Sequence, residues 1–103
     1  LNQLRSNLYI SDAINMIIKS TVKYKNDIFN ISNHNMTTIK KMAQIISKLS
    51  NKKIIKYKSF LKGSPHIIKI SNKKILRSIN LRITTSLKDG LLNTYKWYLN
   101  LCS

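Results

Sequence analysis

The sequence predicts an α/β fold whose sheet is incomplete on its own. Short runs of apolar, strand-forming residues alternate with longer segments in which apolar residues recur every three or four positions, the pattern of strands alternating with amphipathic helices. The expected strands are few, short and separated by whole helices. Alone they would have unpaired edges and apolar faces in water, so we expect them to complete a sheet whose other strands lie elsewhere.

The first expected strand is Leu8–Ile10, a short apolar run. A helix from Asp12 to Val22 follows, because Ser11 or Asp12 can cap a helix and isoleucines then recur at helical spacing. A polar connection leads to the second expected strand, Ile28–Ile31, which ends at a turn rich in Ser and Asn. The apolar side of the Asp12–Val22 helix must pack against another part of the protein.

The segment between Thr37 and Asn51 predicts the next helix. Thr37 or Thr38 can cap its first turn, and Ser50 with Asn51 ends it. Lysine and glutamine side chains lie off its apolar side. That apolar side consists of Ile39, Met42, Ala43, Ile46 and Leu49.

The region after this helix is less regular. Lys52–Lys58 alternates imperfectly around isoleucines and a tyrosine and is a candidate strand. Gly63–Pro65 is a turn that breaks the chain into a loop. Ile67–Ile70 is a further short expected strand.

Two more helices are expected before the end of the chain. The shorter one starts at Ser71 or Asn72 and ends at Asn80, which tolerates the left-handed conformation that closes helices. The last one starts at Ser86, and Asp89 three residues later completes an arrangement close to a capping box. Its expected buried side consists of Leu87, Leu91, Thr94, Tyr95 and Tyr98.

The composition is strongly basic. The 103 residues suffice for one small domain and include 19 basic and three acidic residues, a net charge of +16. Such a balance points to nucleic acid or another polyanion. However, lysine supplies 16 of the positive charges, although arginine reads phosphates and bases better. Lysine, asparagine and isoleucine, all encoded by A/T-rich codons, make up 45 residues. Drift of the genome towards A and T therefore explains the positive charge, and nucleic acid is not the expected partner.

Several kinds of protein are excluded by the sequence. No stretch approaches the roughly 18 to 20 apolar residues of a membrane-spanning helix, and the first residues lack the pattern of a secretion signal, so no membrane partner is expected. Cys102 is the single cysteine, so no disulfide can form within the chain and a cytoplasmic location is expected. Asp12, Asp27 and Asp89 are too few for paired-carboxylate or metal chemistry, and we expect no metal site.

Three segments in fixed order carry a family resemblance: RSNLYISDA at Arg5–Ala13, DIFNIS and TTIKKMA within Asp27–Ala43, and TSLKDGLLNTYKWY at Thr85–Tyr98. They resemble the closing third of the extended short-chain dehydrogenases/reductases, the NAD-dependent epimerase/dehydratase family that modifies nucleotide sugars. The pattern is nearest to GDP-fucose synthases and UDP-glucose 4-epimerase-like proteins. The chain opens at Leu1 in the middle of this pattern, so we expect a C-terminal fragment of a longer Rossmann-type enzyme.

The resemblance implies a division of the fragment into two parts. Residues 1–50 would supply outer strand and helix elements that join the cofactor domain, and residues 51–103 a substrate-binding subdomain with the C-terminal helix. The expected function is to bind a nucleoside diphosphate sugar in an epimerase, dehydratase or reductase. That enzyme would be a homodimer and use NAD or NADP bound by an upstream domain. Two alternatives stay open: an autonomous basic module that binds a polyanion, and a decayed remnant of the enzyme.

The chain departs from the family pattern at several positions. Three residues of the first segment replace acidic or aromatic ones. Ser32 and His34 occupy positions where the family has glycines, which leaves the geometry of that turn open. Gly90 fits the pattern of the last helix. Because glycine weakens a helix by about 1 kcal/mol relative to alanine, we expect close packing against neighbouring backbone there.

The resemblance also implies the substrate-binding residues. Arg5 matches the family arginine that reaches the diphosphate of the nucleotide sugar, a role that suits a permanently charged planar donor. Lys62 and His66 flank the Gly63–Pro65 turn, which resembles family loops that carry basic residues to the nucleotide. These two side chains are weaker candidates, since a turn with solvated polar side chains also explains them.

The catalytic machinery of the family is absent from this segment. That machinery is a tyrosine with a lysine four residues later, where the lysine lowers the pKa of the phenol. None of the five tyrosines has a lysine at that distance, and the two glycines, Gly63 and Gly90, do not form the turn that binds a dinucleotide. We therefore expect no catalytic and no cofactor-binding residue in this chain, which would be inactive alone.

Overall fold

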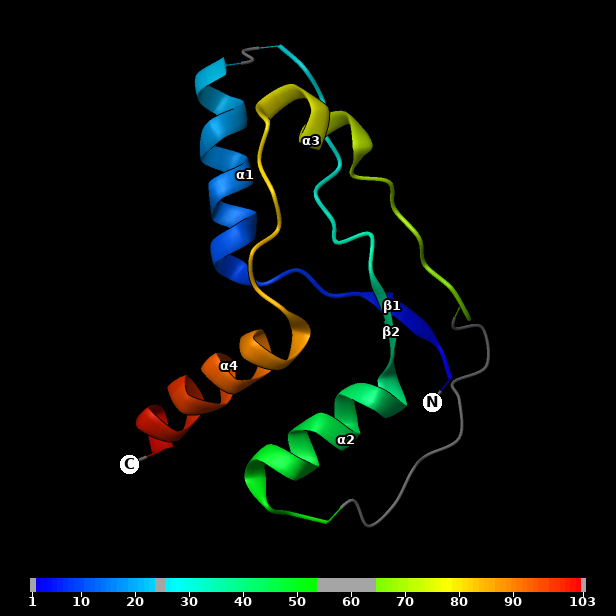
Figure 1. Cartoon of the computed structure of the whole chain (residues 1–103), viewed down its shortest axis with the longest axis vertical. Coiled ribbons are helices and arrows are strands. Elements are labelled where there is room, and N and C mark those ends of the chain that lie inside the picture. Colours follow the sequence, from blue (N-terminus) through cyan, green and yellow to red (C-terminus); the bar gives the residue numbers. More distant parts are fainter. Residues whose placement is uncertain (1, 24–25, 54–64, 103) are drawn as a thin grey trace.

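The computed structural model describes residues 2–23, 26–53 and 65–102. Within these residues, α1 packs on α3 and α2 packs on α4, and two short strands lie between the helix pairs (Figure 1). The α/β class and the alternation of short strands with helices are therefore confirmed for the first half of the chain. The elements are β1 (Leu4–Ser6), α1 (Ile10–Lys23), β2 (Met36–Thr38), α2 (Ile39–Ser50), α3 (Lys73–Ile79) and α4 (Leu87–Cys102).

The two strands form a small antiparallel sheet. Arg5 in β1 lies opposite Thr37 in β2. A second contact reaches β1 from far along the chain, because the Leu4 N–H donates to the His66 carbonyl over 2.8 Å and Leu4 forms an isolated parallel bridge with Ile67. The sheet thus brings both halves of the chain to the same place.

The expected strands are the part of the sequence prediction that is wrong. Leu8 and Tyr9 lie in no strand and Ile10 begins α1, while the first strand lies earlier, at Leu4–Ser6. Ile28–Ile31 forms no strand, and Ile67–Ile70 contributes only the bridge at Ile67. A strand requires a paired neighbour as well as β-forming residues, and apart from the bridge at Ile67 the described residues provide these segments with none. Most of Lys52–Lys58 lies outside the described residues.

The expected helices are confirmed, but the start of the first one is wrong. Helix α1 begins at Ile10, so Ser11 and Asp12, which were expected to cap it, lie inside it. The ends of the other helices follow local rules. The Thr38 hydroxyl accepts a hydrogen bond from the Lys41 N–H over 3.1 Å and caps α2. The Ser86 hydroxyl accepts from the Asp89 N–H at the start of α4. Asn80, which follows α3, has the left-handed conformation expected of it, with φ 49°.

The buried core is small. Among the described residues, three hydrophobic side chains are buried, Met16 from α1 and Ile75 and Ile79 from α3. The partly buried side chains packed around them are Leu8, Phe29, Ile31, Leu76, Leu81 and Ile83. The pairing of α1 with α3 is thus the hydrophobic centre of the described structure.

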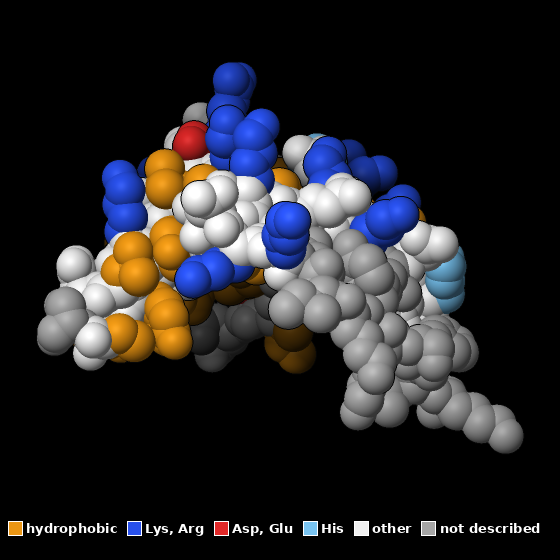
Figure 2. Space-filling model, turned by 90° about the horizontal axis from the view of Figure 1, so that it is seen from below, with side chains coloured by type: hydrophobic (Ala, Val, Ile, Leu, Met, Phe, Trp, Pro, Cys, Tyr) orange, Lys and Arg blue, Asp and Glu red, His pale blue; other side chains and the backbone are white. Residues whose placement is uncertain are grey.

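The last helix buries less than expected. Tyr98 was expected on its buried side, yet the side chain is 56% exposed. Gly90 is buried, and a Cβ placed on it would lie 3.2 Å from Cδ2 of the Tyr9 ring. Close packing therefore occurs at Gly90 as expected, but against an aromatic side chain and not against backbone. Figure 2 shows hydrophobic side chains gathered at the left of the underside, the end of the molecule where Figure 1 places α4.

The molecule is thin and open. Its principal extents are 48 × 37 × 18 Å, and the radius of gyration is 16.1 Å, compared with about 13 Å for a compact domain of 100 residues. None of the described helices is both long and apolar enough to cross a lipid bilayer.

Candidate functional site

Arg5 and His66, two of the three predicted substrate-binding residues, lie next to each other. The guanidinium of Arg5 donates from Nη2 to the Pro65 carbonyl over 2.9 Å and from Nη1 to the carbonyls of Leu4, at 2.8 Å, and His66, at 3.5 Å. The third residue, Lys62, lies outside the described residues. The structure therefore places an arginine of β1 beside the loop that the sequence analysis singled out.

The hydrogen bonds fix where the charge of Arg5 lies. Three backbone carbonyls accept from its planar group, so the guanidinium is held against the 65–66 backbone. The side chain of Arg5 is only partly buried, and that of His66 is exposed. An arginine that is positioned by backbone and still reaches solvent is suited to bind an anion, because its charge is permanent and its donors have fixed directions.

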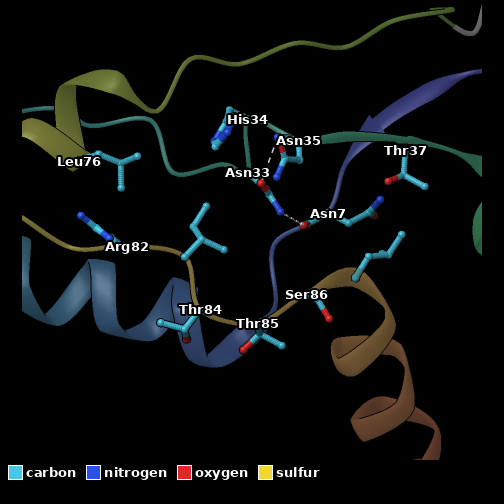
Figure 3. A pocket seen from close by; sticks show the side chains of 12 residues that line it. Asn7, Asn33, His34, Asn35, Thr37, Leu76, Arg82, Thr84, Thr85 and Ser86 are labelled. Carbon is cyan, nitrogen blue, oxygen red and sulfur yellow. Dashed lines mark hydrogen bonds between the residues drawn. The ribbon is translucent and has the colours of Figure 1, made fainter.

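A hollow of about 550 Å³ lies beside the turn at Asn33–Asn35, and we call it the asparagine pocket. In Figure 3 the asparagine turn lies on one side of the pocket and the segment from Arg82 to Ser86 lies on the other. Amide and hydroxyl groups dominate its rim, whereas isoleucine and leucine side chains form much of its wall. Its lining consists of Asn7, Asn33, His34, Asn35, Thr37, Leu76, Arg82, Ile83, Thr84, Thr85, Ser86 and Leu87.

Asn33 holds this turn in place. Its Nδ2 donates to the Asn7 carbonyl over 3.0 Å, and its Oδ1 accepts from the Asn35 N–H over 3.0 Å, as the dashed lines in Figure 3 show. The Ser6 hydroxyl donates to the Asn33 carbonyl over 2.6 Å. The turn is therefore fixed to β1 and to the residue that follows it.

The serine and histidine at the family's glycine positions are compatible with this turn. Among the described non-glycine residues, positive φ angles occur only at Asn51 and Asn80, so neither Ser32 nor His34 needs the conformation that favours glycine. Ser32 is buried; its hydroxyl donates to the Ile70 carbonyl over 2.7 Å, and its own carbonyl accepts from Asn72 Nδ2 over 2.9 Å. The serine thus ties the turn to the start of α3.

Asp12 is a buried acidic residue whose partners the sequence analysis missed. Its carboxylate accepts from the Thr84 N–H at 3.2 Å, the Thr84 hydroxyl at 3.0 Å and the Thr85 N–H at 3.1 Å. Burial raises the pKa of Asp12, but these hydrogen bonds outweigh burial and the net pKa lies below its usual value. Asp12 thereby fixes the segment that walls the asparagine pocket. A feature of the sequence that could have pointed to a role for Asp12 is the rarity of acidic residues.

The asparagine pocket brings several hydrogen-bonding side chains together. No group of three or more His, Cys, Asp or Glu side chains in the described ranges could hold a metal ion. The asparagine pocket offers amides, hydroxyls, one imidazole and one guanidinium, which bind and orient polar ligands.

Comparisons with known proteins match the fold of the chain to solved enzymes. No family model and no curated protein matches the sequence. UDP-glucose 4-epimerase from Thermotoga maritima, solved with UDP-glucose, matches with a TM-score of 0.89 and 20% identity over 99% of this chain and 33% of its own. UDP-glucuronic acid 4-epimerase from Bacillus cereus, solved with UDP-glucuronic acid and NAD, matches with a TM-score of 0.81 and 28% identity over 97% of this chain and 33% of its own.

A dehydratase has the same fold. The dTDP-glucose 4,6-dehydratase from Bacillus anthracis, solved with NAD, matches with a TM-score of 0.79 and 20% identity over 95% of this chain and 32% of its own. The chain thus spans about a third of the length of each of these enzymes. Its fold matches one part of these Rossmann-type enzymes, which supports the family expected from the sequence.

Proposed function

We propose that this chain is the nucleotide-sugar-binding portion of an NAD(P)-dependent epimerase, dehydratase or reductase. The observation that carries the proposal is the match of 97% to 99% of the chain to two epimerases solved with UDP-glucose or UDP-glucuronic acid. The position of Arg5 beside the 65–66 loop supports it further. Binding is the role of this portion, and the chemistry belongs to the whole enzyme.

The proposal assigns a role to each predicted residue. The Arg5 guanidinium binds the diphosphate of the sugar nucleotide, because bidentate, charge-assisted hydrogen bonds favour a phosphate over a neutral ligand. His66, with Lys62 beyond the described residues, covers the nucleotide from the loop. In this proposal residues 1–50 join the cofactor domain and residues 51–103 bind substrate.

The rest of the enzyme completes the reaction. NAD or NADP is bound there and supplies hydride transfer. The proposed enzyme is a homodimer that acts in the cytoplasm, a location supported by the single cysteine of this chain. None of the residues of this chain takes a catalytic role in the proposal.

Titration of the chain with UDP-glucose, dTDP-glucose and GDP-fucose tests the proposal. Saturation-transfer NMR would detect even weak binding, and calorimetry would give the Kd. We expect binding of at least one sugar nucleotide and a loss of roughly tenfold or more in affinity for Arg5→Ala, since a hydrogen bond to a charged group contributes about 1.5–3 kcal/mol.

The matched control is Arg77→Ala, which removes the same charge from an exposed side chain of α3. Arg77→Ala should leave the affinity unchanged, and circular dichroism should show equal helix content in both variants. Equal losses in both variants would mean that net charge alone attracts the ligand. Tight, salt-sensitive binding of a generic DNA duplex would favour the polyanion alternative. Figure 2 shows Lys and Arg side chains at several separate places on the face it displays.

A further inference from the structure

A second hollow of about 550 Å³ lies between the turn that precedes β2 and the segment that leads into α3. Its lining includes two lysines and a histidine, and we call it the lysine hollow. The basic side chains are Lys69, Lys73 and His34, and the apolar wall includes Met36, Ile70 and Leu76. Its volume falls in the range of about 300–1,000 Å³ that is typical of small-molecule sites.

The lysine hollow and Arg5 belong to opposite faces of the small sheet. Residues that pair directly across two antiparallel strands share a face, and successive residues of a strand alternate between the faces. Arg5 pairs with Thr37, whereas Ser6 pairs with Met36. Ser6 and Met36 line the lysine hollow, and neither Arg5 nor Thr37 does. The hollow is therefore separate from the place proposed for the diphosphate of the sugar nucleotide.

The protein does not neutralise the positive charges of this hollow. The chain has three acidic residues, and none of them lines it. Lys74, which follows directly in the sequence, forms an ion pair with Asp27. In the part of the chain that the structure describes, the ammonium groups of Lys69 and Lys73 have no hydrogen bond or ion pair. Two unpaired ammonium groups around one hollow attract an anion.

Hydrogen bonds fix the backbone on both sides of the lysine hollow. The segment that leads into α3 lies beside the segment that leads into β2 (Figure 1). The Ser32 hydroxyl donates to the Ile70 carbonyl over 2.7 Å, and Nδ2 of the buried Asn72 donates to the Ser32 carbonyl over 2.9 Å. At the turn, the Asn33 N–H donates to the Ser6 hydroxyl over 3.0 Å. Because the backbone is already held, a ligand orders only side chains when it binds.

We propose that the lysine hollow binds a phosphate group, at a site distinct from that of the sugar nucleotide. Lys69 and Lys73 bind the phosphate oxygens through charge-assisted hydrogen bonds, and the N–H of the His34 ring donates to them from the turn. His34 occupies a position where the family pattern has glycine, which has no side chain to donate, so this site is a feature of the present chain. The apolar wall leaves room for the organic part of a phosphomonoester.

Titration of the chain with inorganic phosphate, followed by amide NMR at constant ionic strength, tests the site. We expect saturable shifts of the amide signals of residues 34 and 69–73. Lys69→Ala combined with Lys73→Ala should lower the affinity roughly tenfold or more, because hydrogen bonds to a charged group are lost. Lys40→Ala combined with Lys48→Ala removes the same charge from exposed positions of α2 and should leave the affinity unchanged. Equal losses in the two double variants, or shifts that do not saturate, would overturn the site.

Two further measurements define the ligand and the role of the histidine. Phenyl phosphate, titrated in parallel, distinguishes the sources of the phosphate group: tighter binding than inorganic phosphate assigns the hollow to a phosphomonoester, and equal affinity assigns it to free phosphate. His34→Gly, which restores the residue of the family pattern, should lower the phosphate affinity severalfold through the loss of one hydrogen bond. An unchanged affinity in His34→Gly would overturn the role of the histidine.

The same variants separate this site from the proposed function. Arg5→Ala should leave the phosphate-induced shifts of residues 69–73 unchanged, and the Lys69→Ala/Lys73→Ala variant should bind sugar nucleotides as wild type does. Loss of these shifts in Arg5→Ala would merge the two sites and overturn the separate hollow. Phosphate binding without sugar-nucleotide binding contradicts the proposed function alone, whereas the reverse result contradicts the lysine hollow alone.

Discussion

Asp12 joins two segments that lie 72 positions apart in the sequence. Its buried carboxylate accepts two backbone N–H groups and one hydroxyl from Thr84 and Thr85. Without an acceptor these partly buried donors would lose their protein partner, at a cost of up to about 1–3 kcal/mol. The residue therefore fixes the start of α1 to the segment that leads into α4.

Asp12→Asn should destabilise the chain by about 1–3 kcal/mol at pH 7. Because the folded-state pKa of Asp12 is lowered, its stabilising contribution is complete above the unfolded pKa, near 3.9, and is lost as the pH falls through the folded pKa. The difference between wild type and Asp12→Asn should therefore shrink below about pH 4. Urea unfolding followed by circular dichroism between pH 7 and pH 3 measures this.

Asp89→Asn is the matched control, because Asp89 is exposed in the first turn of α4 and such a helix-end charge contributes less, about 0.3–1 kcal/mol. Asp27 also has a lowered pKa, through its hydrogen bond with Lys74, so acid destabilises the wild type through Asp27 as well. The test is therefore the difference in unfolding free energy between wild type and Asp12→Asn. A constant difference between wild type and Asp12→Asn down to pH 3 would contradict the assigned role.

The site residues show what sequence can and cannot predict. Arg5 and His66 were singled out through the family resemblance, and their proximity follows from the pairing of β1 with the 65–66 loop. The asparagine pocket was not predicted, because its walls come from separate stretches of the chain, around Asn7, Asn33 and Thr84. Polar residues at turn positions look alike in a sequence whether or not they share a pocket.

Most helix ends are local features, and for this reason the sequence predicts them well. The start of α1 is the exception, because the carboxylate of Asp12, a candidate cap, accepts instead from distant backbone. Thr38 and Ser86 cap their helices through the next three residues, and Asn80 closes α3 by its own backbone conformation. Strands depend on partners that the sequence does not identify. Ile28–Ile31 has the composition of a strand, but no described segment pairs with it.

Thr38→Ala should destabilise the fold by about 1 kcal/mol, because the Lys41 N–H loses its acceptor at the first turn of α2. Thr38→Ser keeps the hydroxyl and should restore most of the loss. Urea unfolding measures both variants against wild type. Equal losses of stability for the Ala and Ser variants would assign the effect to the Cγ2 methyl group of Thr38, which both variants lack, and would contradict the cap.

The whole molecule is an open layer, with a radius of gyration of 16.1 Å and few buried side chains. Within the described residues the hydrophobic core consists of Met16, Ile75 and Ile79. The incomplete sheet expected from the sequence and the exposed isoleucines of α1 have the same physical cause, since both are surfaces that a neighbouring layer would cover. These isoleucines are Ile10, Ile14, Ile17 and Ile18. Periodicity predicts that a face is apolar, but it does not tell which face the fold leaves exposed.

The isolated chain should therefore bind a hydrophobic dye such as ANS and unfold over a broad temperature range. Ile14→Lys combined with Ile18→Lys should lower the dye fluorescence without lowering helix content, because both side chains are about half exposed. Met16→Ala, a change on the opposite side of α1, should instead cost about 2–5 kcal/mol through the cavity it leaves and should not reduce dye binding. A wild-type chain that binds no dye and melts sharply as a monomer would mean that the exposed isoleucines of α1 need no cover. The assignment of this chain to one layer of a larger enzyme would then lose its physical basis.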